Sequence, residues 1–147
     1  MKIAICSDHR GYELKTKLVK KLLEKDIKCE DYGCFNDERC DYPKFAFKVG
    51  ESVSAGECPF GVVICGSGDG VTIVANKVKG VRCVCVKDEA HVKRARQHVD
   101  VNVLAFAAEE TSAEEALKMV ETMLTTNFLG DRYKERLEMI DEYEAKK

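Results

Sequence analysis

The chain lacks a long apolar run, a basic stripe and any pair of cysteines at metal-binding spacing. The apolar run near its N-terminus is far too short for a signal sequence, and no segment approaches the length of a membrane span. Its 24 lysines and arginines nearly balance its 26 aspartates and glutamates, which argues against a nucleic-acid partner. We therefore expect a cytoplasmic protein that binds neither membrane nor nucleic acid, and whose ligand, if anionic, is small.

The eight cysteines follow neither a zinc pattern nor a disulfide scaffold. Zinc sites need pairs at C-x-x-C-like spacing, which occurs nowhere in the chain. Several cysteines lie inside apolar runs and no signal peptide precedes them, which favours reduced thiols. We expect no metal site, and we interpret every cysteine except Cys65 as a small core or surface residue.

Apolar runs typical of buried strands alternate with amphipathic stretches along the chain. The 147 residues suffice for one core, so we expect a single domain over residues 1–147. The expected strands are Lys2–Cys6, Ile27–Tyr32, Phe60–Cys65, Val81–Val86 and Val101–Phe106. The expected helices are Tyr12–Lys25, Pro43–Ala55, Val71–Lys79, Asp88–His98 and Ser112–Thr125. The alternation predicts an α/β fold, a three-layer α/β/α sandwich around a five-stranded parallel, Rossmann-like sheet.

One more helix, Arg132–Glu144, is expected beyond the fifth strand-helix unit. Its Leu137, Ile140 and Tyr143 form an apolar strip, and a helix in this place often packs on a neighbouring chain. Arg132 and Arg136 lie one turn apart, and two guanidinium groups at this spacing suit a phosphate. The alternative is a solvated helix face on which they pair with nearby glutamates.

The most informative segment is Cys65–Gly70, where a buried strand leads into one cysteine followed by three glycines in five residues. Alternate glycines let the backbone approach a ligand closely, and successive N–H groups at a helix start bind anions. A thiol beside such groups gains thiolate character. The segment therefore predicts a reactive thiol at an anion-binding loop.

Three chemistries compete for Cys65, beside the alternative of an inert buried thiol. A phosphatase nucleophile needs C-x5-R, and Val71 occupies the arginine position. A dinucleotide site needs G-x-G-x-x-G, and the third glycine is missing. A general base remains: a thiolate removes a carbon-bound proton while the N–H groups hold the enediolate oxygen.

Candidate partners of the thiol come from three further places in the chain. Asp8 and His9 follow the first strand directly, although such a pair is often only a turn with a cap. His98 ends a predicted helix, where it could also merely complement the helix dipole. Ligands of such folds collect at the carboxyl ends of the strands, and we expect these groups and the two arginines of the last helix to lie along that edge.

The motifs in their order resemble the type B ribose-5-phosphate isomerases and their galactose- and allose-6-phosphate relatives. The likeness spans nearly the whole chain. The segments that carry it are Ser7–Tyr12, Asp41–Pro43, Ile64–Gly68, Ala75–Lys77, Arg96–His98, Asn102–Leu104, and Arg132 with Arg136.

The resemblance implies an aldose-ketose isomerase of the pentose phosphate pathway that interconverts D-ribose 5-phosphate and D-ribulose 5-phosphate. It implies that Cys65 is the base, that Ser67 helps to hold the enediolate, and that His98 with Asp8 assists furanose ring opening. The substrate-binding residues that it implies are His9, Tyr42, Gly66, Gly68, Asp69, Gly70, Val99, Arg132 and Arg136. It further implies no metal or organic cofactor, a dimer or tetramer with active sites shared between subunits, and the strand order 2-1-3-5-4.

Three residues depart from the family pattern. Val99 stands where asparagine is usual, Asp69 where a small or apolar residue is usual, and Glu109 where an arginine commonly faces the phosphate. They bear on affinity and sugar choice more than on the type of reaction. The alternatives are a galactose- or allose-6-phosphate isomerase, a non-catalytic sugar-phosphate-binding protein and a thiol hydrolase. The intact Arg96–His98 segment favours the pentose enzyme.

Overall fold

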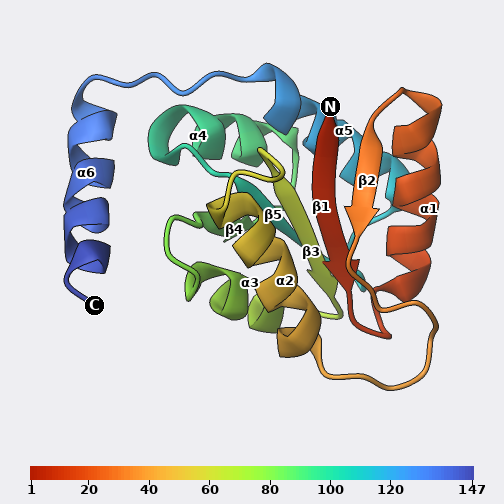
Figure 1. Cartoon of the computed structure of the whole chain (residues 1–147). Coiled ribbons are helices and arrows are strands. Elements are labelled where there is room, and N and C mark those ends of the chain that lie inside the picture. Colours follow the sequence, from red (N-terminus) through yellow and green to blue (C-terminus); the bar gives the residue numbers. More distant parts are fainter.

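A computed structural model describes the whole chain, residues 1–147. Five parallel strands form one sheet in the order β2-β1-β3-β5-β4 (Figure 1). The strands are β1 Lys2–Ser7, β2 Lys28–Asp31, β3 Gly61–Cys65, β4 Cys83–Cys85 and β5 Val103–Ala107. The helices are α1 Tyr12–Glu24, α2 Tyr42–Ser54, α3 Asp69–Asn76, α4 Glu89–Val99, α5 Ala113–Thr125 and α6 Arg132–Ala145. The predicted α/β fold and the strand order implied by the resemblance are both confirmed.

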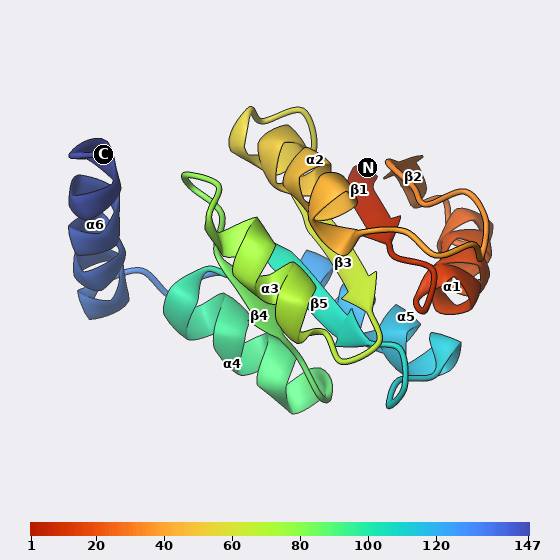
Figure 2. The same ribbon diagram turned by 90° about the horizontal axis from the view of Figure 1, so that it is seen from below.

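The sheet is covered on both faces, because its central strands are apolar on both faces. Every residue of β3 and β5 is buried. In β1, Ile3 and Ile5 pack with α1, α4 and α5, whereas the smaller Ala4 and Cys6 pack with α2 and α3. Figure 2, which looks at the carboxyl ends of the strands, shows α2 and α3 on one side of the sheet and α1, α4 and α5 on the opposite side. The alternation of side chains along each strand thus fixes the three layers.

The outer strands are shorter than the apolar runs that predicted them. Strand β4 was expected over Val81–Val86 but pairs only over Cys83–Cys85. The reason lies at its start, where the Arg82 N–H donates to the Asn102 side-chain oxygen at 2.7 Å, so that a side chain takes a place in the sheet ladder. An edge strand is paired on one side only, so that such a competing bond ends it early.

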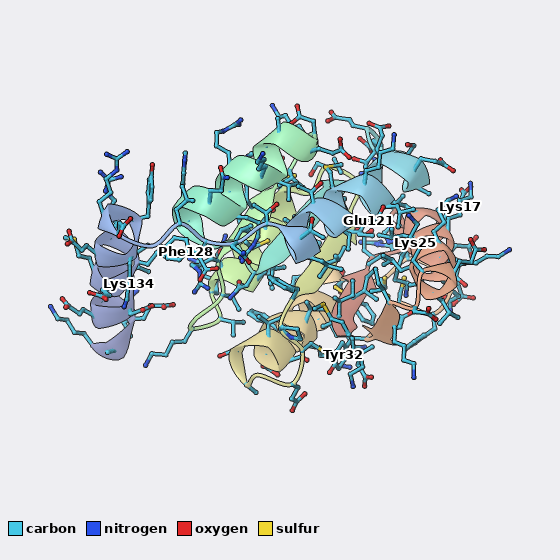
Figure 3. The ribbon with its side chains drawn as sticks, turned by 90° about the horizontal axis from the view of Figure 1, so that it is seen from above. Lys17, Lys25, Tyr32, Glu121, Phe128 and Lys134 are labelled. Atoms are coloured by element: carbon cyan, nitrogen blue, oxygen red, sulfur yellow. The ribbon has the colours of Figure 1, made fainter.

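Helix α6 lies apart from the sandwich. None of its residues is buried, and Met139, Ile140 and Tyr143 are 68%, 49% and 62% exposed. Figure 3 shows Phe128 on the segment that leads to it and Lys134 on the helix, both away from the sheet. Its neighbour within the chain is α4. The predicted helix is therefore confirmed, and its apolar strip has no place in the core of its own chain. None of the helices has the length and apolar character needed to cross a lipid bilayer.

Candidate active site

The Cys65 thiol lies at the end of β3, where the chain turns into α3. The side chain is 5% exposed, and its Sγ accepts a hydrogen bond from the Gly68 N–H at 3.2 Å. Gly68 adopts φ +79, a conformation that glycine reaches without strain, and α3 begins at the next residue. The sulfur therefore lies at the start of α3, and the backbone N–H that donates to it is that of Gly68. Such a bond stabilises a negative sulfur, as the predicted reactive thiol requires.

Other thiols of the chain lie in surroundings that keep them neutral. Burial raises the pKa of Cys29 and of Cys83 to about 12. Burial also raises the pKa of Cys6 and of Cys85. All eight cysteines are free, and no three His, Cys, Asp or Glu side chains are arranged to hold a metal ion. Cys65 differs from these four in accepting a backbone N–H at a helix start.

Asp8 forms the turn that follows β1. Its Oδ1 accepts the N–H groups of Arg10 at 2.9 Å and of Gly11 at 3.0 Å, and its own N–H donates to the Ile64 carbonyl. The alternative interpretation of Asp8 and His9, a turn with a cap, is therefore correct for Oδ1 of Asp8. Asp8 is 5% exposed, and Oδ2 makes no hydrogen bond within the chain. That second oxygen is free for a ligand.

The His9 ring is oriented by the loop between β2 and α2. Its Nδ1 accepts the Cys40 backbone N–H at 3.3 Å. A neutral imidazole carries one proton, so this bond assigns the proton to Nε2. His9 therefore presents a hydrogen-bond donor with its other nitrogen.

Tyr42 and the residues after Cys65 complete this edge. The Tyr42 ring lies against Gly70, since a Cβ on that glycine would come within 2.5 Å of the ring Cζ and 2.8 Å of the hydroxyl. The Ser67 hydroxyl accepts the Asp69 N–H at 3.2 Å, and both side chains are exposed. A cavity of about 410 Å³ opens beside Ser67, Asp69 and Cys85. We refer to Asp8, His9, Tyr42 and Cys65–Gly70 as the cysteine cluster.

The loop after β5 also reaches this edge. The Glu109 N–H donates to the Gly66 carbonyl at 3.2 Å, and its carboxylate pairs with the Arg10 guanidinium. By the family resemblance, Glu109 stands where an arginine commonly faces the phosphate. The cation that pairs with Glu109 is Arg10, which was not predicted as a site residue although it follows His9 directly.

A second group of predicted residues meets at the contact of α4 with α6. The rings of His98 and Tyr133 stack at 4.6 Å between centroids, with 9° between their planes. Arg132 and Arg136 both face the Tyr133 ring, at 5.1 Å and 6.0 Å. We refer to His98, Arg132, Tyr133 and Arg136 as the histidine cluster. Neither arginine pairs with a glutamate, so the expected alternative of an ion-paired helix face does not apply.

The expectation that all these groups share one edge is wrong within a single chain. Helix α4 leaves the carboxyl end of β4 and returns to the start of β5, so His98 near its end is carried to the opposite edge of the sheet (Figure 1). Val99, which is 40% exposed, goes with it. The error has a topological cause: in a parallel sheet, the end of a connecting helix lies at the amino ends of the strands. The stacking partner Tyr133 was also missed, because nothing in the sequence pairs it with His98.

Comparison with known proteins identifies the family. The sequence model of the Ribose/Galactose Isomerase family matches residues 3–140. The chain belongs to the ribose/galactose isomerase family. Ribose-5-phosphate isomerase B of Escherichia coli is 38% identical over 146 residues, which cover 99% of this chain and 98% of that protein.

Solved structures of this family have the same fold. Ribose-5-phosphate isomerase B of Clostridium thermocellum matches with a TM-score of 0.95 at 40% identity, over 99% of both chains. The Mycoplasma genitalium enzyme, solved with bound ribulose 5-phosphate, matches with a TM-score of 0.92 at 38% identity, over 99% of this chain and 97% of that one. The family that the motifs indicated is thereby confirmed.

Proposed function

We propose that this member of the ribose/galactose isomerase family interconverts D-ribose 5-phosphate and D-ribulose 5-phosphate, and that residues 1–147 act as one domain. The observation that carries the proposal is the Cys65 thiol, whose Sγ accepts the Gly68 N–H at 3.2 Å where α3 begins. Relatives that are 38% identical to this chain are named for this reaction, and one of them was solved with ribulose 5-phosphate. The chain is an intramolecular oxidoreductase.

Cys65 acts as the base in the proton transfer. Its thiolate takes the proton from C2 of the open-chain aldose, and the electrons of that bond form the C1–C2 double bond while the C1 carbonyl oxygen becomes negative. The backbone N–H groups of Gly66 and Gly70 and the Ser67 hydroxyl stabilise this enediolate, while the Gly68 N–H stays with the sulfur and its glycine lets the loop approach the substrate. The Cys65 thiol then returns the proton to C1, the O2 proton passes to O1, and C2 becomes the ketone.

The other residues bind and open the sugar. Asp8 Oδ2 and the His98 imidazole assist opening of the furanose ring, and His9 donates from Nε2. Tyr42 lines the pocket, as the contact of its ring with Gly70 supports. Asp69 lies exposed at the start of α3.

The active site takes residues from two copies of the chain. The cysteine cluster lacks His98, and the histidine cluster lies at the other edge of the sheet. Exposed apolar residues on α6 give the second copy a surface on which to pack. We propose a homodimer in which His98, Val99, Arg132 and Arg136 of one copy complete the cysteine cluster of the other.

Exchange of the sugar protons tests the reaction directly. Proton NMR of ribose 5-phosphate with the protein in deuterated water should show formation of ribulose 5-phosphate and deuterium at the exchanging carbon. Allose 6-phosphate and galactose 6-phosphate, run in parallel, should exchange more slowly. Faster exchange of a hexose phosphate would assign the chain to the other branch of the family. Binding of ribose 5-phosphate with neither exchange nor formation of ribulose 5-phosphate would refute an isomerase.

A further inference from the structure

Arg10 places a cation at an edge of the sheet where acidic side chains prevail. Asp8, Asp69, Glu109 and Glu110 all belong to loops or helix starts at the carboxyl ends of the strands. A sugar phosphate adds its phosphate dianion to these carboxylates. A fixed cation at this edge would therefore favour the binding of such a ligand.

The Arg10 side chain is held in place over the glycine loop. Its backbone N–H is fixed by Asp8 Oδ1 at 2.9 Å. Its guanidinium lies against Gly66, since a Cβ on that glycine would come within 2.7 Å of Cζ and 2.8 Å of Nε. Only a residue without a side chain lets the guanidinium approach the loop this closely.

Glu109 engages one part of the guanidinium and leaves the rest free. The ion pair joins Arg10 Nη2 to Glu109 Oε1, and the guanidinium makes no other hydrogen bond in the chain. A guanidinium has five N–H donors, of which a carboxylate occupies at most two. The Arg10 side chain is 56% exposed, so the remaining donors are open to a ligand at the mouth of the loop.

We propose that Arg10 binds the phosphate of the substrate and that Glu109 is the residue that positions it. The inference rests on the proposed function, because it takes the ligand of this edge to be a sugar phosphate. It gives the carboxylate at position 109 a purpose: Glu109 orients the guanidinium over Gly66. One cation of the phosphate site is thus supplied by the loop after β1, beside Arg132 and Arg136 of the second copy, while the loop after β5 supplies its anchor.

Arg10→Gln tests the proposal, with Lys17→Gln as the matched control. Lys17 is a nearby cation that pairs with Glu13 one turn along α1, and Figure 3 shows it on the outer side of that helix. Arg10→Gln should raise the KM for ribose 5-phosphate and the inhibition constant of inorganic phosphate by about tenfold or more, with kcat within about threefold. Lys17→Gln should change both constants less than about twofold. Equal values of KM and of the inhibition constant in the two variants would show that Arg10 and Glu109 form only a surface ion pair, and would overturn the proposal.

A readout without turnover separates this proposal from the proposed function. Inorganic phosphate should slow the alkylation of Cys65 by iodoacetamide in the wild-type protein, and Arg10→Gln should shift the protecting concentration by the same factor. If the wild-type protein fails to isomerise ribose 5-phosphate, but phosphate protects its Cys65 and this protection is lost in Arg10→Gln, the phosphate site stands and the proposed reaction is refuted. Undiminished protection in Arg10→Gln would refute the phosphate site alone.

The positioning role of Glu109 has its own signature. In the wild-type background, Glu109→Gln loses the anchor of Arg10 but also removes a negative charge near the phosphate. In the Arg10→Gln background only the second effect remains, so the substitution should lower KM there by more than in the wild type. Equal effects of Glu109→Gln in both backgrounds would show that Glu109 does not act through Arg10.

Discussion

The cysteine cluster is held by backbone hydrogen bonds at the carboxyl edge of the sheet, whereas the histidine cluster is held by ring stacking on α6, a helix with no buried residue. Cys65 and Asp8 each accept a backbone N–H of the turn that follows them, and His9 accepts one from the loop between β2 and α2. His98 instead stacks on Tyr133, and the two arginines lie beside the same ring. The first cluster is assembled from loops at one edge of the sheet, and the second lies at the contact of α4 with the exposed helix α6. The comparison underlies the proposed homodimer, in which one chain supplies the base and the other the histidine.

Cys65→Ala should break the first cluster with the largest effect of any substitution considered. Loss of a general base costs about 10²- to 10⁴-fold in kcat/KM. The fold should persist, because the sulfur that is removed is small. Circular dichroism should therefore show unchanged secondary structure. Cys29→Ala is the control, since Cys29 lies on β2 away from the glycine loop and should leave kcat unchanged. Near-normal turnover in Cys65→Ala would exclude the thiolate as the base.

Replacing both arginines of the histidine cluster tests whether that cluster binds the phosphate. Arg132→Gln with Arg136→Gln should raise the KM for ribose 5-phosphate by about ten- to a hundredfold, since each charged hydrogen bond to a phosphate is strong. Lys134→Gln on the same helix is the control; that lysine faces Glu138 at 4.0 Å. Steady-state kinetics at fixed ionic strength measure the difference. A KM that rises as much in the lysine variant would assign the effect to the general charge of α6.

Tyr133→Ala should sharpen the comparison by removing the ring on which His98 stacks and beside which the two arginines lie. A stacked aromatic pair contributes about 0.5 to 1.5 kcal/mol, so we expect kcat to fall by about three- to tenfold. Tyr133→Phe keeps the ring and should restore most of the turnover. The measurement is kcat for ribose 5-phosphate in both variants. An equal loss in the phenylalanine variant would mean that the hydroxyl, which receives the Arg132 N–H at 3.1 Å, matters more than the stacking.

The buried thiols predict a smaller effect, on stability at alkaline pH. Burial raises the pKa of Cys83 from 9.0 to about 12. The unfolded chain therefore releases this proton first, so the stabilisation is complete below pH 9 and is lost as pH rises from there towards 12. Each such thiol adds a slope of about 1.4 kcal/mol per pH unit within that window. Urea unfolding between pH 8 and 10 should show a shallower loss in Cys83→Ala, and an identical pH dependence in the variant would contradict the account.

Local patterns predicted most of the fold. Strands β3 and β5 are buried on both faces and read as apolar runs, so their positions were found to within two residues. The ends of β4 were not, because the bond from Arg82 to the Asn102 side chain joins parts of the chain that no local pattern connects. The strand order came from the family resemblance, since periodicity carries no information on which strands are neighbours.

The candidate site likewise has a part that the sequence predicted and a part that it did not. The loop Cys65–Gly70 was predictable, because its chemistry is contained in consecutive residues. The pairing of Arg10 with Glu109 and the stacking of His98 on Tyr133 were not, because each depends on tertiary packing. The edge on which His98 lies was predicted wrongly, and its place follows only from the direction of α4.

Mixing two inactive variants tests the shared site most directly. Cys65→Ala and His98→Asn should each be inactive, one lacking the base and the other the ring-opening imidazole. In random mixed dimers half the molecules carry both variants, and each of those has one site with an intact cysteine and an intact histidine. Unfolding the two together and refolding them should therefore recover about a quarter of the wild-type activity. A mixture as inactive as its two parents would contradict an active site built from two chains.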